Sequence, residues 1–217
     1  MNTFIITAAG IGKRMGTSLP KQFLLIKGKP ILIHTLERFY QTDPTAEIFI
    51  TLPADWLSYW EELIETHKCE IVHTVVTGGI ERYDSIKNAV NLASGKIICV
   101  HDGVRPLVST ETIQNCIKMA MDNGSGIPYL TIKESIRKLS VDGSNTVNRM
   151  DFITVQTPQC FSEEILKKAY SLPFHSNITD DASLVEEAGF KIHLVEGNPE
   201  NIKITLPSDL IIAEQFL

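Results

Sequence analysis

Cysteine is scarce in this sequence, and the few cysteines form no recognisable binding pattern. The 217 residues include four, at Cys69, Cys99, Cys116 and Cys160, and no two of them form a C-x-x-C pair. This spacing excludes the common zinc-binding patterns and a dense disulfide framework. Three of the four lie in apolar or helix-like segments, which favours buried free thiols.

The two best-known nucleotide-binding patterns are also missing, although a glycine-rich basic loop follows the first apolar run. The loop is TAAGIGKRMGTSLPKQF, residues 7–23. A P-loop requires G-x-x-x-x-G-K-[ST], and here no lysine follows Gly16. A dinucleotide-binding turn requires G-x-G-x-x-G, and here the interval is one residue longer. Because Lys13, Arg14 and Lys21 supply more positive charge than a bridging pyrophosphate needs, we expect the loop to bind a triphosphate.

The sequence has neither an excess of positive charge nor a long apolar segment. Its formal net charge is −6, which argues against a broad nucleic-acid-binding surface. The first residues, MNTFIITAAG, lack the basic segment that begins a signal peptide, and their apolar run is too short to span a membrane. We therefore expect a cytoplasmic protein whose loop cations bind a small anion.

Short apolar runs alternate with segments of helical periodicity along most of the chain. We expect strands near residues 3–9, 46–53, 70–79, 96–103 and 191–197, and helices near 31–42, 55–67, 82–95, 110–124, 162–172, 180–189 and from about 206. Asp55 and either Ser109 or Thr110 are the expected caps at helix starts, and Gly95 and Gly124 the expected ends. The alternation predicts an α/β fold with a doubly wound, mostly parallel sheet.

The alternation breaks between about residues 131 and 152. Two extended segments flank Asp142-Gly143, a dipeptide typical of a hairpin turn. A two-stranded hairpin is only marginally stable alone, so we expect this arm to pack against the sheet or against a second subunit. Its apolar surface would be formed by Ile136, Leu139, Val141, Val147 and Met150.

Four polar motifs follow four of the predicted strands. They are the opening loop, TGGIERYDS at 77–85, VHDGVRP at 100–106 and EGNPENIKIT at 196–205. Ligands of open α/β sheets bind at the carboxyl ends of the strands, so we expect the four motifs to meet around one site.

Two of these motifs allow a structural and a functional interpretation. A carboxylate at the end of a buried strand needs a cation. Asp102 would therefore either hold Mg²⁺ beside phosphate oxygens or pair with Arg105. Asp84 and Ser85 lie at the start of the next helix, where capping is the simpler role.

Taken together, the motifs are recognisable. AAGIGKRMG…PKQF, GGxxRxDS, HDGVRP, TPQ.F, TDDAS and GNPENIKIT.P.D occur in this order along essentially the whole chain. In this the sequence resembles the 2-C-methyl-D-erythritol 4-phosphate cytidylyltransferase family of the non-mevalonate isoprenoid pathway. The resemblance implies a single nucleotidyltransferase domain over residues 1–217, with a Rossmann-like core and a β-arm at about 131–152 that locks a homodimer.

The resemblance also implies an activity and a set of site residues. The enzyme would transfer a cytidylyl group from CTP to 2-C-methyl-D-erythritol 4-phosphate, giving 4-diphosphocytidyl-2-C-methyl-D-erythritol and diphosphate. The positions that match CTP-binding residues are Ala8, Ala9, Gly10, Gly12, Gly79 and Ser85. The positions that match catalytic residues are Arg14, Lys21, Asp102 and Lys203, with Asp102 also matching the metal ligand. The positions that match substrate-binding residues are Arg105, Ser135, Arg149 and Thr179.

The sequence departs from the family's pattern at three places. Ser135 stands where many members carry Thr on the arm, and its hydroxyl can still hydrogen-bond to a substrate. HDGVRP replaces the more common HDAARP and retains its Asp and Arg. Ile80 follows the paired glycines where some members have Asp, so backbone groups would have to recognise the base.

The chemistry itself calls for cations more than for a base. A phosphate monoester attacks the α-phosphorus of CTP while diphosphate leaves, and all three groups are anionic. A phosphate is already a nucleophile at pH 7, and no Ser-His-Asp arrangement is apparent. Arg14 and Lys21 would stabilise the α-phosphate, and Mg²⁺ on Asp102 would bridge phosphate oxygens. His101 ends an apolar strand, which favours a structural role over that of a general base.

Three other functions remain to be separated. A cytidylyltransferase for ribitol 5-phosphate or another pentitol phosphate shares the first half of the motifs, although TDDAS favours methylerythritol phosphate. A non-catalytic nucleotide-binding regulator would have little reason to keep Arg14, Lys21, Asp102 and Lys203 together. The glycine spacing disfavours an NAD-dependent dehydrogenase.

Overall fold

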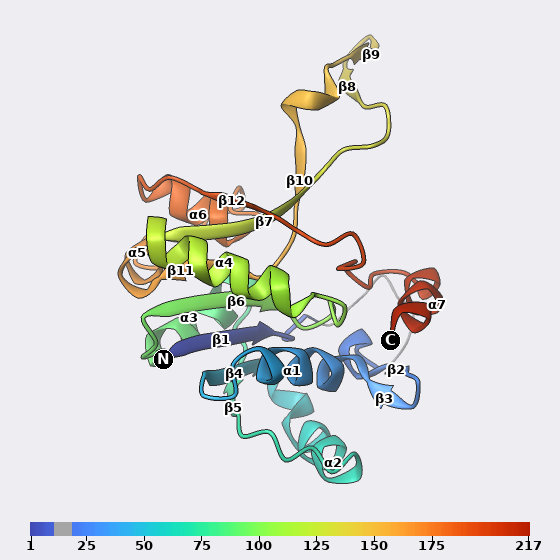
Figure 1. Cartoon of the computed structure of the whole chain (residues 1–217), viewed down its shortest axis with the longest axis vertical. Helices are drawn as coiled ribbons and strands as arrows, with labels where there is room; N and C mark the ends of the chain where they lie inside the picture. The colour runs from blue at the N-terminus through green and yellow to red at the C-terminus, as the bar shows by residue number, and fades with distance from the viewer. Residues whose placement is uncertain (11–18) are drawn as a thin grey trace.

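A central sheet of eight strands organises the part of the chain that the structure describes, a computed structural model covering residues 1–10 and 19–217. The strand order is β10-β7-β11-β6-β1-β4-β5, with β12 paired to β7 (Figure 1). Only β10 and β11 run against the other strands of this sheet. The strands are β1 Asn2–Thr7, β4 Glu47–Leu52, β5 Thr74–Thr77, β6 Ile97–Asp102, β7 Ser125–Thr131, β10 Ile153–Val155, β11 Gln159–Ser162 and β12 Leu194–Glu196.

Helices cover both faces of the sheet, because successive side chains of each strand point to opposite faces. In β1, Phe4 and Ile6 pack with one set of helices, whereas Ile5 packs with the other. The first set is α1 Ile31–Thr42, α2 Leu57–Thr66 and α4 Thr110–Asn123. The second set is α3 Arg82–Leu92, α5 Glu163–Ala169 and α6 Asp181–Glu187. These layers confirm the predicted doubly wound, mostly parallel Rossmann-like α/β fold.

A smaller apolar cluster closes the end of the molecule beside the carboxyl edge of the sheet. The C-terminal helix α7, Pro207–Phe216, contributes Ala213 to this cluster, where it meets Ile26 and Ile204. Near it lie the short strands β2 Leu25–Ile26 and β3 Lys29–Pro30 (Figure 1). No helix in the described ranges combines the length and apolar character needed to cross a membrane.

The predicted helix ends are partly correct. Ser109 caps α4 by accepting the Thr112 N–H at 3.0 Å, and Gly124 ends this helix with a φ of +89°. Asp55, in contrast, lies in the 3-10 turn η3 Ala54–Trp56, ahead of α2, whose cap makes no side-chain hydrogen bond. Helix α3 ends at Leu92, before Gly95, and Gly95 lies so close to β1 that a Cβ there would be 2.5 Å from the Thr3 nitrogen.

The predicted hairpin is present and projects from the sheet (Figure 1). Strands β8 Arg137–Ser140 and β9 Gly143–Thr146 pair antiparallel, so Val141 and Asp142 form the tip of the turn. Strands β7 and β10 form the stem of this arm, and the 3-10 turn η4 Arg149–Asp151 lies between β9 and β10. Three apolar side chains of the arm are almost wholly exposed, namely Leu139, Val141 and Met150.

Candidate active site

A cavity of about 570 Å³ lies at the carboxyl ends of β1, β4 and β6. As expected, all four polar motifs reach it, because the strands that precede them end at the same edge of the sheet. Its lining includes Ala8, Ala9, Gly10, Lys21, Gly79, Ser85, Asp102, Lys203 and Thr205. Gly12 and Arg14, which the sequence also assigned to this site, lie outside the described residues.

The opening loop is held in place by a buried glutamine that the sequence analysis did not single out. Gln22 Nε2 donates to the carbonyl oxygens of Ala8 at 2.6 Å and Gly10 at 3.2 Å. The Ala8 N–H in turn donates to the Thr51 carbonyl on β4. Because Gln22 belongs to the motif PKQF, the resemblance contained a signal for this role, which is to position the loop that faces the cavity.

Lys21 is fixed in the cavity wall by a contact with the last polar motif, residues 196–205. It begins the 3-10 turn η2, Lys21–Phe23, and its Nζ donates to the Ile204 carbonyl at 2.9 Å. Phe23 anchors the same turn in an aromatic cluster with Trp56 and Tyr59. The ammonium group is therefore positioned by packing on one side and by residues 203–205 on the other.

The turn at residues 78–81 is stabilised by the first residues of α3. The Gly79 N–H donates to Ser85 Oγ at 3.0 Å, and that hydroxyl donates to the Glu81 carbonyl at 3.1 Å. The Glu81 N–H donates to Asp84 Oδ2, which completes a capping box. The predicted capping role is thus confirmed for Asp84, while Ser85 closes the turn and also lines the cavity.

The paired glycines of this turn are required by close packing within the protein. A Cβ on Gly78 would lie 2.5 Å from the Ala9 Cβ, and a Cβ on Gly79 would lie 2.2 Å from the Asp84 Cβ. The turn can therefore approach both the opening loop and α3 only with glycine at both positions. Ile80, by contrast, is 96% exposed and forms part of the cavity wall.

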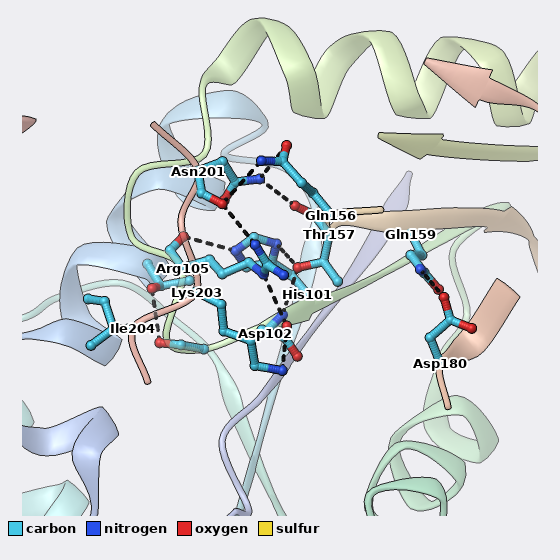
Figure 2. A network of polar contacts seen from close by, with 12 residues as sticks. His101, Asp102, Arg105, Gln156, Thr157, Gln159, Asp180, Asn201, Lys203 and Ile204 are labelled. Carbon is cyan, nitrogen blue, oxygen red and sulfur yellow. Dashed lines mark hydrogen bonds and ion pairs between the residues drawn. The ribbon is translucent and has the colours of Figure 1, made fainter. Parts of the chain in front are cut away.

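Asp102 lies at the centre of the polar network in Figure 2. It ends β6 and is 7% exposed, and its Oδ2 contacts both Arg105 Nε and Lys203 Nζ at 3.1 Å. Burial acts to raise the pKa of this carboxyl, but the charges of Lys203, Arg82 and Arg105 outweigh it and hold the pKa well below its usual range. The carboxylate is therefore ionised, and the predicted pair with Arg105 is present.

A chain of hydrogen bonds behind Asp102 fixes its backbone. The Asp102 N–H donates to Thr157 Oγ1, and the same hydroxyl contacts His101 Nδ1 at 2.9 Å. His101 Nε2 contacts the Arg105 carbonyl, which can only accept, so Nε2 carries the proton and Nδ1 accepts from Thr157. Burial lowers the pKa of His101 to about 4, which keeps the ring neutral. His101 therefore has the structural role that the sequence favoured.

A second set of hydrogen bonds connects Arg105 and Thr157 to the last polar motif, residues 196–205. Arg105 Nη1 donates to the Asn201 carbonyl at 2.8 Å, and Asn201 Nδ2 donates to the Thr157 carbonyl at 2.8 Å (Figure 2). Thr157 and Asn201 belong to TPQ and GNPEN, which carried the resemblance without a role for either residue. Arg105 lies behind Asp102 and does not contribute to the cavity lining.

The other three residues assigned to the substrate are, like Arg105, not part of the cavity lining of their own chain. Thr179 is exposed ahead of α6, where its N–H donates to Ser183 Oγ. Ser135 and Arg149 lie on the arm, and the Arg149 guanidinium donates to the Lys133 carbonyl. Within one chain, the structure therefore brings together the opening loop, the turn at 78–81, Asp102 and Lys203, but not the arm.

Comparison with known proteins agrees with this arrangement. A sequence model of the 2-C-methyl-D-erythritol 4-phosphate cytidylyltransferase family matches residues 3–217. A protein of that name from Bacteroides fragilis is 46% identical over 99% of both chains, and one from Porphyromonas gingivalis is 43% identical over 98% of this chain and 96% of its own.

Solved structures give the same result. The crystal structure of 2-C-methyl-D-erythritol 4-phosphate cytidylyltransferase from Thermus thermophilus has a TM-score of 0.80 at 29% identity, covering 99% of this chain and 97% of that one. The 4-diphosphocytidyl-2C-methyl-D-erythritol synthase from Anaerococcus prevotii has a TM-score of 0.85 at 26% identity, covering 99% and 95%. The chain therefore belongs to the 2-C-methyl-D-erythritol 4-phosphate cytidylyltransferase family.

Proposed function

We propose that the cavity at the ends of β1, β4 and β6 is the place where this chain transfers a cytidylyl group from CTP to 2-C-methyl-D-erythritol 4-phosphate. The products are 4-diphosphocytidyl-2-C-methyl-D-erythritol and diphosphate. The observation that carries this proposal is the meeting of Lys21, Lys203 and Asp102 in one cavity of a chain that belongs to this family. The names of the relatives favour this substrate over ribitol 5-phosphate.

The cavity wall offers complementary surfaces for the parts of CTP. Ala9 and Gly10 line the cavity, where their backbone N–H groups can donate to phosphate oxygens, and Gly12 of the same loop is assigned to the same role. The turn around Gly79 and Ser85 lies across the cavity and is assigned to the base. Since Ile80 carries no polar group, backbone atoms of this turn supply the hydrogen bonds to cytosine.

The cations of the site stabilise a reaction between anions. Lys21, with Arg14 from the same loop, stabilises negative charge on the α-phosphate as diphosphate leaves. Lys203 contacts Asp102 and lies where it can hold the attacking phosphate of the second substrate. A phosphate monoester needs no general base, and the neutral, wholly buried His101 is not placed to act as one. Positioning of the two substrates can supply roughly 7–11 kcal/mol of the barrier reduction.

A divalent cation such as Mg²⁺ fits the site through Asp102. No group of three His, Cys, Asp or Glu side chains in the described ranges could hold a metal by itself. Mg²⁺ bound mainly by phosphate oxygens needs only one or two carboxylates. Both cations contact Oδ2 of Asp102, which leaves Oδ1 as the atom for a metal. When bound there, the ion would neutralise charge on the phosphates of CTP.

The arm is assigned to a homodimer in which each subunit completes the site of the other. Leu139, Val141 and Met150 are exposed on it, and an apolar surface of this kind is typical of an interface. A two-fold axis would exchange the two arms symmetrically. Ser135 and Arg149, which lie between the stem of the arm and its hairpin, then bind the partner's sugar phosphate. Thr179 and Arg105 are the remaining positions assigned to the substrate.

The cytoplasmic location expected from the sequence stays a prediction.

One assay tests the proposed reaction. The protein is incubated with CTP and either 2-C-methyl-D-erythritol 4-phosphate or ribitol 5-phosphate, and diphosphate release is followed. We expect turnover with the first substrate and little with the second, and Lys203→Ala serves as the matched control. Faster turnover with ribitol 5-phosphate would assign the alternative substrate, and no turnover with either would favour a non-catalytic regulator.

A further inference from the structure

A third cationic side chain lines the cavity and has no role in the transfer as assigned so far. Arg82 is the first residue of α3 and follows the turn at 78–81 directly. It lines the same cavity as Lys21 and Lys203, and 35% of its side chain is exposed. An arginine in this position can face an anionic ligand from the side of the cavity that carries the base-binding turn.

Arg82 is held from behind by a wholly buried carboxylate. Its Nη2 donates to Asp181 Oδ2 at 2.7 Å, and the Asp181 side chain is 0% exposed. The hydroxyl of Tyr170, itself buried, donates to Asp181 Oδ1. A buried carboxylate without its cation is costly, so this pair fixes the guanidinium strongly.

The carboxylate is in turn fixed by the start of α6. Gln159 Nε2 donates to Asp180 Oδ2 at 2.7 Å, a contact visible in Figure 2, and its Oε1 accepts the Ala182 N–H at 2.8 Å. Asp181 lies between these two anchored residues. The TPQ and TDDAS motifs thereby determine where the Arg82 side chain lies, although they are far from it in sequence.

The guanidinium retains donors for a ligand. It has five N–H groups in a planar fork, and Asp181 is its one hydrogen-bond partner among the residues that the structure describes. The remaining donors suit a phosphoryl group, which arginine binds through two parallel hydrogen bonds.

We propose that Arg82 is a further phosphate-binding residue of this site, whose guanidinium donates to a phosphoryl oxygen of the reactants while Asp181 and Tyr170 hold it in position. The inference rests on the cytidylyl transfer proposed above. The phosphoryl group belongs either to CTP or to the polyol phosphate, since both bring the same chemistry into the cavity.

Steady-state kinetics with CTP and 2-C-methyl-D-erythritol 4-phosphate test this role. The main variant is Arg82→Ala/Asp181→Asn, which removes both charges and leaves no buried carboxylate unpaired. We expect its kcat/KM to fall about 10²-fold, as for loss of one electrostatic donor. A rise in KM for CTP places the contact on the nucleotide, and a rise in KM for the polyol phosphate places it there. Lys118→Ala, on the exposed face of α4, is the matched control with unchanged kinetics.

Two further measurements separate contact with a phosphoryl group from support of the fold. Added guanidinium ion should restore part of the rate of the double variant. Tyr170→Phe keeps the ring stacked on Tyr83 but removes the hydroxyl, so we expect a smaller loss of kcat/KM without loss of structure. If circular dichroism shows that the double variant is unfolded, the kinetics of Arg82→Lys test the role instead. This variant keeps the positive charge but loses the planar set of N–H donors.

The outcomes for the inference and for the proposed function differ. An inactive wild-type protein would overturn the proposed transfer. The role of Arg82 alone would be overturned if the wild-type protein is active and the double variant has unchanged kcat and KM values. If the double variant is unfolded, unchanged kcat and KM values of Arg82→Lys would overturn it.

Discussion

Mixing two inactive variants tests whether the arm completes the active site of a second subunit. Lys203→Ala removes one of the two cations that contact Asp102 at 3.1 Å in the cavity. Arg149→Ala changes η4, on the projecting arm, which does not line the cavity of its own chain. Loss of one such electrostatic contact lowers kcat by about 10²–10³, so each variant alone should be nearly inactive.

The expected recovery follows from counting intact sites. If two arms are exchanged around a two-fold axis, an equal mixture gives about half mixed dimers. In each mixed dimer, one site combines an intact Lys203 with an intact Arg149, and the other site carries both lesions. Activity should therefore return to about one quarter of the wild-type value.

The assay is diphosphate release before and after the two proteins have exchanged subunits. A mixture of Lys203→Ala with Lys21→Ala is the matched control, because both residues line the cavity of one chain and every site in that mixture keeps a lesion. Recovery of activity in this control would show that the recovered activity does not report on sites shared between two subunits. Absence of recovery with Arg149→Ala after complete exchange, or a monomer by analytical ultracentrifugation at the assay concentration, would refute the shared site.

Other predictions concern the cations, the metal and the buried histidine. Lys21→Ala and Arg14→Ala should each lower kcat about 10²–10³-fold with an unchanged circular dichroism melt, and near-normal kcat in both would contradict their assignment. Asp102→Asn should weaken activity and Mg²⁺ dependence together, whereas full wild-type activity in excess chelator would exclude a metal. His101 has a pKa of about 4 when folded against 6.5 as its ordinary value, so the unfolded state binds the extra proton between these values. The free energy of unfolding should thus fall as the pH drops from 6.5 to 4, by about 1.4 kcal/mol per pH unit from this residue. Urea unfolding of His101→Gln should lack this part of the slope, and an equal slope in both proteins would refute the lowered pKa.

The sequence by itself determined the elements whose signals are local. Helix α1 occupies residues 31–42 as its periodicity predicted, and α4 ends at the glycine that its sequence indicated. Strand β6 is buried along its whole length, as its continuous apolar run required. The ends of these parallel strands share one edge of the sheet, so the convergence of the four motifs was also predictable.

The structure alone decided which strands run antiparallel. Strands β10 and β11 have three and four residues, too short to show a periodicity, and β7 contains glycine and proline. Their positions are set by pairing with partners distant in sequence. In the same way, the glycine at position 95 is required by close packing against β1 and is not the end of α3, which lies at Leu92.

The site shows the same division between local pattern and long-range contact. The residue types at Lys21, Asp102 and Lys203 followed from motifs, because charge and glycine spacing are visible in one segment. The pairing of Arg82 with Asp181 joins residues 99 positions apart, and the Lys21 contact with the Ile204 carbonyl joins residues 183 apart. No local pattern carries such information, since hydrogen bonds between distant segments depend on how the helices and strands pack. The sequence therefore determined which groups are available for catalysis, and the tertiary structure decided which of them face the same cavity and which hold the others in place.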